Sequence, residues 1–379
     1  MESAKSRFLR YVTYYTTSDE FTGTSPSTER QKDLGRALMQ ELEALKLEDV
    51  HMDDCGNVLA TLPASEGVDA PVIALIAHMD TAPDASGENV KPRLVRYEGG
   101  ELKLNDTVSL TEALCPGLES HVGEELIVTD GTTLLGADDK AGVAEIMAAV
   151  ETMIEKNVKH GEVRVIFTTD EEIGNGVDGL DVQELGCDYG YTVDGGPLGE
   201  IEFENFNAAT AAMAFHAMLP EDEVPEKTDG YEGFFHLTEM SGSVTEATLR
   251  YIIRDHDRER FEEKKALFAD CAARLDEIYG NGTAEAQIND SYYNMKEKLL
   301  PHFHLIERAE NAFRANGVEP QCVPIRGGTD GARLSWDGLP CPNLSTGGYN
   351  YHGVREWIPA DSLEAMMNVL VTLTESFAE

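Results

Sequence analysis

The sequence predicts an α/β protein built around a largely parallel sheet, with a second, smaller domain inserted into the chain. Before residue 205, continuous apolar runs alternate with amphipathic helical patterns, which indicates strands buried on both faces by helices. Between about residues 205 and 300 this alternation stops, and helical periodicity resumes from residue 302. A chain of 379 residues also exceeds the usual size of a single hydrophobic core.

The elements of the larger domain follow from local patterns. Thr28 and Gln31 form a capping box for a helix whose leucine stripe covers 34–45. The apolar run at 71–77 predicts a strand buried on both faces, which ends at His78. A strand is expected at 125–129, and a helix follows Asp139. Two further strands are expected at 162–168 and at 189–193.

The inserted domain is expected to be α+β. Antiparallel strands are predicted within 231–255, and a charged amphipathic helix over 258–279. Helical periodicity returns at 302–316, and a last helix begins at Asp361, an N-cap with Glu364 three residues further on. We therefore predict a discontinuous large domain and an inserted small one, with the boundaries 1–206, 207–299 and 300–379.

Composition argues against several classes of partner. The chain has 70 Asp and Glu against 30 Lys and Arg, a formal charge of -40, which repels nucleic-acid phosphates and anionic lipid. No apolar run is long enough to span a bilayer, and residues 1–10 are charged where a signal peptide needs an apolar run. We expect a cytoplasmic protein without nucleic-acid or membrane partners. The six scattered cysteines form no C-x-x-C pair, so neither a thiolate zinc site nor a disulfide framework is expected.

Polar residues follow several of the apolar runs directly. In open α/β sheets, ligands bind beyond the carboxyl ends of the strands, so these residues are expected to share one site. A lone carboxylate at a strand end is usually a helix cap or a solvated loop residue, but a convergent set is hard to explain in that way. Two imidazoles with several carboxylates favour a dinuclear zinc site over a calcium site. The set comprises His78, Asp80, Asp138, Asp139, Asp170, Glu171, Glu172 and Asp194, and the glycine-rich segment 347–353 adds His352 as the second imidazole.

Six motifs carry a resemblance to a known family: AHMDT (77–81), LLGADDKAG (134–142), TDEEIG (169–174), YTVDGG (191–196), IRGGTDG (325–331) and TGGYNYHG (346–353). On these motifs, nearly the whole chain resembles the cocatalytic-zinc exopeptidases related to carboxypeptidase G, aminoacylase and succinyl-diaminopimelate desuccinylase. The last two motifs, with EFENFN at 202–207, resemble the peptidase T branch of tripeptide aminopeptidases. The resemblance implies a zinc-exopeptidase-like three-layer α/β/α catalytic domain and an inserted lid domain.

The resemblance also implies a division of the metal ligands between two zinc ions. One zinc is held by His78 and Asp194, and the other by Glu172 and His352. Asp138 bridges both ions. An anionic bridge between two dications is electrostatically favourable.

Further roles are implied for residues around the ligands. Asp80 accepts the second ring N–H of the ligand histidine that precedes it and fixes its tautomer. Glu171 is the general base, which takes a proton from water and returns it to the leaving amine. The peptide between Asp138 and Asp139 is expected to be cis. Arg326 binds the C-terminal carboxylate of the peptide substrate.

The leading functional prediction is hydrolysis of the N-terminal peptide bond of tripeptides, by an enzyme that can form a homodimer through its lid domain. A related zinc dipeptidase, carboxypeptidase or N-acyl amino acid deacylase is the enzymatic alternative. A zinc-dependent peptide-binding protein without turnover is an alternative of a different class. It is favoured if the lid domain has lost a segment.

The lid domain departs from the family near residue 210. Residues 205–210 begin like a strand, whereas 211–219 already have the pattern of a helix end closed by Pro220. The family has at this point the rest of the strand, a loop with an Asn-x-His-Pro-Gly type sequence and most of a helix. Either the segment is deleted or the sequence as written omits it. A strand joined to a helix end favours omission, which predicts a Cα–Cα step within 207–213 much longer than about 3.8 Å.

Overall fold

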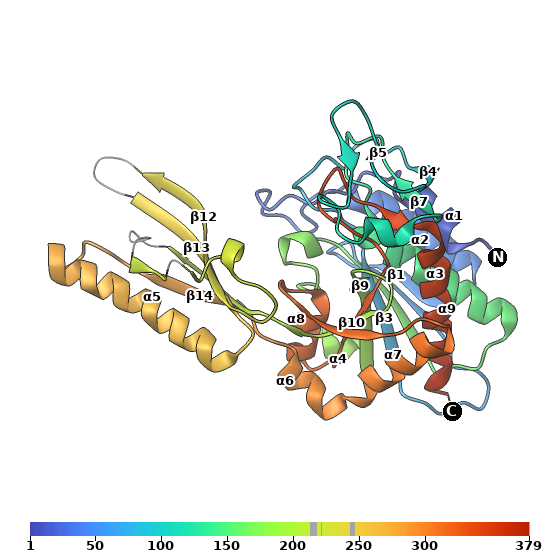
Figure 1. Cartoon of the computed structure of the whole chain (residues 1–379). Helices are drawn as coiled ribbons and strands as arrows, with labels where there is room; N and C mark the ends of the chain where they lie inside the picture. Colours follow the sequence, from blue (N-terminus) through green and yellow to red (C-terminus); the bar gives the residue numbers. More distant parts are fainter. Residues whose placement is uncertain (213–217, 221, 243–246, 379) are drawn as a thin grey trace. The chain divides into compact units, whose positions relative to one another are not determined.

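The computed structural model describes residues 1–212, 218–220, 222–242 and 247–378, with the backbone alone at 209–212 and 247. It divides into two compact units (Figure 1). The first unit comprises Met1–Ile201, His302–Cys322 and Thr329–Glu379, and the second Glu202–Pro301 and Val323–Gly328. The predicted boundaries had left 323–328 in the larger domain. These residues instead belong to the second unit, where the Arg326 guanidinium lies over the rings of Phe206 and Phe234.

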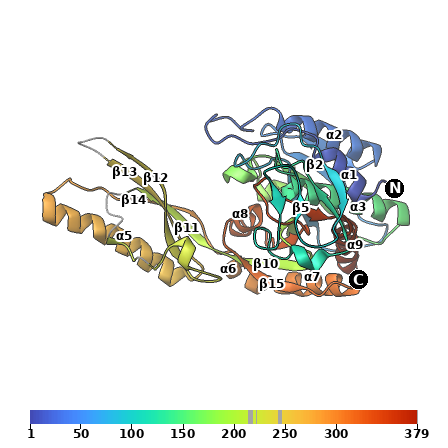
Figure 2. The same cartoon turned by 45° about the horizontal axis from the view of Figure 1, so that its top comes forward.

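The first unit is a three-layer α/β/α sandwich around an eight-stranded mixed sheet (Figures 1 and 2). The strands of this sheet, in spatial order, are β1 (Glu48–Met52), β2 (Val58–Leu62), β8 (Val163–Thr168), β3 (Ile73–His78), β9 (Tyr189–Gly195), β16 (Asn343–Ser345), β10 (Glu200–Asn205) and β15 (Gln321–Ile325). Residues 202–205 of β10 and 323–325 of β15 are assigned to the second unit. The central strands β8, β3, β9 and β16 are parallel, whereas β2 pairs antiparallel with β8 and with β1. The carboxyl ends of the four parallel strands therefore lie at one edge of the sheet.

Helices cover both faces of this sheet. They are α1 (Ala4–Tyr11), α2 (Gln31–Ala44), α3 (Ala137–Lys156), α4 (Val182–Leu185), α7 (His304–Ala315), α8 (Asp330–Asp337) and α9 (Ala360–Ser376). All six residues of β3 are buried, as the continuous apolar run predicts. Ala74 and Ile76 pack with residues of α4 and α8, whereas α3 packs on β3 and β9 and is itself covered by α1 and α9.

Three details differ from the sequence-based expectations. The Thr28 hydroxyl donates to the Thr17 carbonyl instead of capping α2, and α9 begins at Ala360 without a side-chain cap.

The strand β7 (Glu125–Val128) lies outside the main sheet. It pairs antiparallel with β4 (Arg93–Arg96) and β17 (Ile358–Pro359), and a hairpin of β5 (Leu102–Lys103) and β6 (Ser109–Leu110) lies nearby in the chain. Pairing with β17, far along the chain, is a long-range contact that the local pattern does not reveal.

The second unit is a four-stranded antiparallel sheet with one long helix. The sheet has the order β12 (Phe234–Gly242), β13 (Ala247–Asp255), β11 (Asn207–Ala212) and β14 (Gln287–Tyr292). The helix α5 (Arg258–Tyr279) packs on β13 and β11, and the short helix α6 (Lys296–Leu299) follows. Phe235, Tyr251, Ile253, Phe261 and Phe268 form the centre of its apolar core.

The strand β11 tests part of the prediction that a segment of the family is missing near residue 210. It pairs with β13 residue by residue, from Asn207 opposite Asp255 to Ala212 opposite Arg250. The helix pattern predicted from 211 is therefore wrong at Ala211 and Ala212, which belong to the strand. This uninterrupted register also excludes a break within 207–212. The step to 213 and the rest of the expected helix end, over 213–217, lie outside the described residues.

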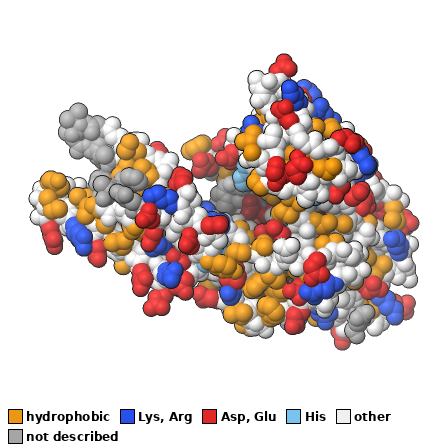
Figure 3. Space-filling view, viewed as in Figure 1, with side chains coloured by type: hydrophobic (Ala, Val, Ile, Leu, Met, Phe, Trp, Pro, Cys, Tyr) orange, Lys and Arg blue, Asp and Glu red, His pale blue; other side chains and the backbone are white. Residues whose placement is uncertain are grey.

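The surface is strongly acidic. Asp and Glu side chains are spread over the face shown in Figure 3, where Lys and Arg are sparser. In the described part of the chain, no helix combines the length and the apolar character that crossing a bilayer requires.

Glu145 is an acidic residue enclosed in the apolar core of the first unit. Glu145, on α3, is fully buried, and neither of its carboxylate oxygens has a hydrogen-bond partner among the described residues. Burial, reinforced by the charge of Glu364, raises the pKa of Glu145 well above its ordinary value. The folded protein therefore favours the neutral carboxylic acid, whereas the unfolded chain ionises above a pKa of about 4.3.

Replacing Glu145 by Met should stabilise the protein, because Met fills a similar space without an unsatisfied polar group. We expect the free energy of unfolding at pH 8 to rise by about 1–3 kcal/mol. Because the pKa of Glu145 is raised in the folded state, the wild-type glutamate contributes fully to stability below its unfolded pKa. This contribution is lost progressively as pH rises above the unfolded pKa. The advantage of the variant should therefore grow from pH 4 to pH 8 in urea unfolding.

Glu151, on the same helix, provides a control of opposite sign. Burial opposes its ionisation, but hydrogen bonds from Arg7 and the Glu2 amide hold the pKa of Glu151 below its ordinary value. Its stabilising contribution is present above the unfolded pKa and is lost as pH falls. Glu151→Gln should therefore lower stability at neutral pH. An unchanged or lower stability of Glu145→Met across this pH range would contradict our description of the buried carboxyl.

Candidate metal centre

The predicted site residues of the first unit lie where strands or loops end at one edge of the parallel sheet. His78 is the last residue of β3, and Asp194 is the penultimate residue of β9. Glu171 and Glu172 begin the 3-10 turn η2 (Glu171–Ile173), which follows β8. Parallel strands place their carboxyl ends side by side, and this geometry brings residues far apart in sequence into one cluster.

Asp138 occupies the centre of the cluster. Its Oδ1 lies 2.8 Å from Nε2 of His78, and its Oδ2 lies 3.1 Å from Nε2 of His352. Each carboxylate oxygen therefore faces a different imidazole. A carboxylate between two histidines in this orientation can bridge two cations, one on each side.

Asp194 and Glu171 lie on the His78 side of the bridge. Nε2 of His78 is 3.3 Å from Oδ1 of Asp194 and 4.0 Å from Oε2 of Glu171. The other ring nitrogen, Nδ1, lies 3.2 Å from the carbonyl oxygen of Asp80 and 3.3 Å from its carboxylate. An Nδ1–H that donates to Asp80 leaves the Nε2 lone pair free to bind a cation.

The Asp80 carboxylate also orders the turn that carries the two glutamates. Its two oxygens accept hydrogen bonds from the backbone N–H groups of Glu171, at 3.1 Å, and Glu172, at 3.3 Å. Asp80 is itself completely buried. One side chain thus fixes both the orientation of His78 and the start of the turn η2.

Glu172 lies on the side of the second imidazole. Its Oε2 is 3.1 Å from Nε2 of His352. Its other oxygen, Oε1, is buried and has no hydrogen-bond partner among the residues that the structure describes. A buried carboxylate oxygen without a donor is costly unless a cation satisfies it, so the donor set fits a metal ion.

Geometry groups the possible ligand atoms in two overlapping sets. The atoms of His78, Asp138 and Glu172 lie within 4.8 Å of one another, as do those of His78, Asp139 and Asp194. Asp139 is less suited to bind metal, because its carboxylate already accepts the backbone N–H groups of His78 and Gly142.

The peptide between Asp138 and Asp139 is cis, as the resemblance implied. Gly142, one turn into α3, packs directly against β9. A Cβ at this position would lie 2.0 Å from the carbonyl oxygen of Val193 and 2.5 Å from Oδ1 of Asp139. Only glycine therefore fits where the start of α3 meets the strand that carries Asp194.

The charges of the cluster perturb each other strongly. Burial and the neighbouring carboxylates raise the pKa of Glu172 to about 8 and that of Asp194 to about 6. Hydrogen bonds from His352 and His78 hold the pKa of Asp138 far below its usual range, although burial opposes this effect. The acidic partners in turn raise the pKa of His352 to about 11. This concentration of buried negative charge favours cations.

A buried glutamate that the sequence did not single out completes the site. Glu356 is 1% exposed, and its carboxylate accepts four consecutive backbone N–H groups, those of Leu135, Gly136, Ala137 and Asp138. The only signal in the sequence is its position four residues after His352. Nothing in the local pattern indicates that this carboxylate reaches back to the start of α3.

Arg326, the predicted carboxylate-binding residue, lies in the second unit. Its guanidinium donates to the Gly230 carbonyl at 3.0 Å and to the Thr228 hydroxyl at 3.1 Å. It is partly buried there. Its role in binding substrate stays a prediction.

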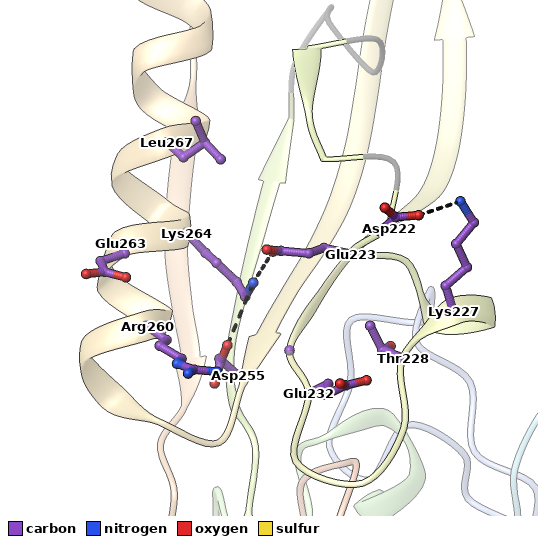
Figure 4. A pocket seen from close by; sticks show the side chains of 11 residues that line it. Asp222, Glu223, Lys227, Thr228, Glu232, Asp255, Arg260, Glu263, Lys264 and Leu267 are labelled. Carbon is purple, nitrogen blue, oxygen red and sulfur yellow. Dashed lines mark hydrogen bonds and ion pairs between the residues drawn. The ribbon is translucent and has the colours of Figure 1, made fainter.

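A cavity of about 520 Å³ lies elsewhere in the second unit, between α5 and residues 222–233 (Figure 4). It contains none of the predicted site residues. Lys264 on its wall pairs with Glu223 and Asp255, and Lys227 pairs with Asp222. Both lysines of this cavity are therefore paired with carboxylates, in contrast to the unpartnered oxygen of the metal centre.

Comparison with known proteins decides the family. The family model "Peptidase family M20/M25/M40" matches residues 125–376. This chain belongs to that peptidase family. It is therefore a peptidase, a hydrolase that acts on peptide bonds.

Within the M20/M25/M40 family, the chain groups with proteins named peptidase T. It is 48% identical to peptidase T of Parabacteroides distasonis over 97% of both chains. It is 46% identical to peptidase T of Caldanaerobacter subterraneus over the full length of both. The latter alignment has 407 positions against 379 residues in this chain, so at least 28 positions have no residue here. A shorter chain agrees with a segment missing near residue 210, by deletion or by omission from the sequence as written, and the location of the missing positions stays a prediction.

Solved structures show the same fold. An aminopeptidase from Bacillus cereus named PepT matches with a TM-score of 0.75 and 24% identity over 99% of both chains. A tripeptidase from Staphylococcus aureus matches with a TM-score of 0.74 and 22% identity over 99% of this chain and 98% of that one. A Bacillus subtilis protein described as a dinuclear metal-binding M20 peptidase has a TM-score of 0.64 at 15% identity, over 99% of this chain and 98% of its own.

Proposed function

We propose that this peptidase is a dinuclear zinc aminopeptidase that removes the N-terminal residue from tripeptides. The observation that carries the metal centre is the Asp138 carboxylate, which presents one oxygen to each of two imidazoles. The Bacillus subtilis M20 peptidase of the same fold is described as binding two metal ions. Two imidazoles with carboxylates suit zinc, although manganese or cobalt can use the same donors.

We divide the proposed ligands by the imidazole that each carboxylate pairs with, although Glu172 also lies within 4.8 Å of the donor atoms of His78 and Asp138. His78 and Asp194 would hold one ion, and Glu172 and His352 the other, with Asp138 shared. The unpartnered Oε1 of Glu172 provides a further donor atom. When bound, the two ions would polarise the scissile carbonyl and lower the pKa of water.

Glu171 is the proposed general base. It is partly buried, and its carboxylate points toward the same ring nitrogen of His78 as the carboxylate of Asp194 does. Asp80 accepts the backbone N–H groups of both glutamates and so orders the turn that carries them. In this turn Glu171 would face the substrate while Glu172 faces the metal. Glu171 would take a proton from the attacking water and deliver it to the amine that leaves.

The choice of tripeptides rests on the relatives. Proteins named peptidase T match the chain over its whole length, and a solved tripeptidase shares the fold. Arg326 stays the proposed binder of the C-terminal carboxylate, since a guanidinium binds a carboxylate with two parallel hydrogen bonds. A cytoplasmic location and a homodimer through the second unit are kept as parts of the same proposal.

A panel of peptides of matched sequence tests the substrate class. Trialanine, dialanine, tetra-alanine and N-acetyl-trialanine should be compared with zinc-loaded protein, by following release of free alanine and, from the acetylated peptide, of acetate. We expect kcat/KM to be highest for trialanine and hydrolysis of the acetylated peptide to be negligible. Preferential cleavage of the acetylated peptide or of dialanine would overturn the tripeptide proposal in favour of a deacylase or a dipeptidase. Tight peptide binding without release of alanine would favour the binding-protein alternative.

A further inference from the structure

The segment 346–357 connects three ligand-bearing parts of the metal centre. It supplies His352 itself. Its Thr346 and Tyr351 hydroxyls lie 2.9 Å from the carbonyl oxygen of Gly195 and can donate to it, next to the ligand Asp194. Its Glu356 accepts the N–H groups that lead into Asp138.

Within this segment, residues 349 and 357 are held close together. Tyr349 and Trp357 exchange two backbone hydrogen bonds, of 2.9 and 3.1 Å, and their rings stack with centroids 4.2 Å apart. Trp357 is fully buried, and His121 packs edge-on against both rings. His352 and Glu356 therefore lie on one short loop that is closed at its base.

The contacts of Glu356 are unusual in number and in position. One oxygen accepts from Leu135 at 2.7 Å and Gly136 at 2.9 Å. The other accepts from Ala137 at 2.6 Å and Asp138 at 3.1 Å. Asp138 and Asp139 have non-helical backbone angles, so these four N–H groups precede the regular part of α3 and need an acceptor from outside the helix. That acceptor is a side chain more than two hundred residues away in sequence.

From this geometry, we propose that Glu356 is a positioning residue that holds Asp138 in the orientation in which it faces both imidazoles. Glu356 does not contact the side-chain atoms that would bind metal. It acts through the backbone N–H groups of the loop that carries Asp138, the proposed bridging ligand. Because it shares a loop with His352, it also fixes the spacing between that imidazole and Asp138. The proposal rests on the proposed metal centre and assigns this chain a further residue on which metal affinity depends.

Glu356→Gln tests this role with a side chain of nearly the same shape. The amide offers one acceptor oxygen and places its NH₂ group against two backbone N–H donors, so half of the contacts should be lost. Supporting residues around metal ligands usually contribute 10–100-fold to metal affinity. We expect a weakening of that size in a competition titration of Zn²⁺ with a chromophoric chelator, on purified apoprotein. Glu356→Asp keeps the carboxylate and should lie between the wild type and Gln.

The Co²⁺ absorption spectrum provides a readout that general destabilisation does not move. At saturating Co²⁺, Glu356→Gln should change the visible band shape relative to the wild type, because Asp138 and His352 are displaced. Glu112→Gln is the matched control. Its carboxylate accepts the N–H groups of Gly117 and Glu119, in the same unit but outside the cluster of site residues. The control should bind Zn²⁺ and Co²⁺ as the wild type does.

The outcomes separate the inference from the function on which it rests. Failure of the wild-type protein to bind Zn²⁺ would refute the metal centre and the inference with it. Wild-type binding together with unchanged Zn²⁺ affinity and an unchanged Co²⁺ spectrum in Glu356→Gln would refute the positioning role alone. Weakening by the same factor in Glu112→Gln would also refute it, because the effect would then be one of general destabilisation.

Discussion

Glu171→Gln should lower kcat for tripeptide hydrolysis by about 10²–10⁴-fold, the usual contribution of a general base. The amide keeps the size of the side chain but cannot accept the proton of the attacking water. Because Glu171 is not a proposed ligand, the variant should bind zinc with the affinity of the wild type. KM should change little, so the loss should lie in kcat.

The measurement combines steady-state kinetics at saturating zinc with the metal content of the dialysed protein. Glu184→Gln, an exposed glutamate in the first turn of α4, is the control and should match the wild type. A Glu171→Gln enzyme that retains kcat within a few-fold would show that another group moves the proton. A loss of zinc from this variant would instead make Glu171 a ligand.

Asp138→Asn should weaken metal binding more than any change outside the ligand set, by at least about 100-fold in affinity. The amide is neutral and offers one good acceptor oxygen where the carboxylate offers two. It can therefore face one imidazole but cannot bridge two cations. Hydrolysis should fall to the background rate at zinc concentrations that saturate the wild type.

Isothermal titration of the apoprotein with Zn²⁺ checks this expectation. Asp130→Asn serves as the control: hydrogen bonds from Thr132 and Lys91 lower the pKa of Asp130 to about 2, and it lies in a loop outside the cluster. This control should leave zinc affinity unchanged. Two zinc ions bound to Asp138→Asn with wild-type affinity would contradict the assignment of Asp138 as the bridge.

The sequence predicted much of the fold because buried parallel strands have a local signature. The run that became β3 is apolar at every position and is buried at every position. The boundary of the inserted unit was harder to predict. Residues 323–328 belong to the second unit, where Arg326 contacts two aromatic rings, and no local pattern encodes such long-range contacts.

The residues of the candidate metal centre could be collected from the sequence because most of them directly follow strands. Parallel strand ends converge, so adjacency to a strand end predicts adjacency in space. Residues that support them from a distance have no such signal. Gln31 illustrates this difference: the sequence suggested a capping role, whereas its side-chain amide exchanges hydrogen bonds with Asp170, just before Glu171.

Glu356 shows the same limit more clearly. Its four partners lie more than two hundred residues earlier in the chain. A lone glutamate in a loop is most often solvated, so the sequence favours an exposed side chain. Only the folded structure shows that its carboxylate is enclosed and directed toward Asp138.

The most direct test of the dinuclear centre is the metal stoichiometry of the active enzyme. Apoprotein prepared with a chelator should be titrated with Zn²⁺, while bound zinc per chain and release of alanine from trialanine are followed together. We predict no activity without metal, two zinc ions per chain at saturation, and full activity only when both are bound. Full activity after complete removal of metal, or saturation at fewer than two ions with full activity, would contradict the central claim.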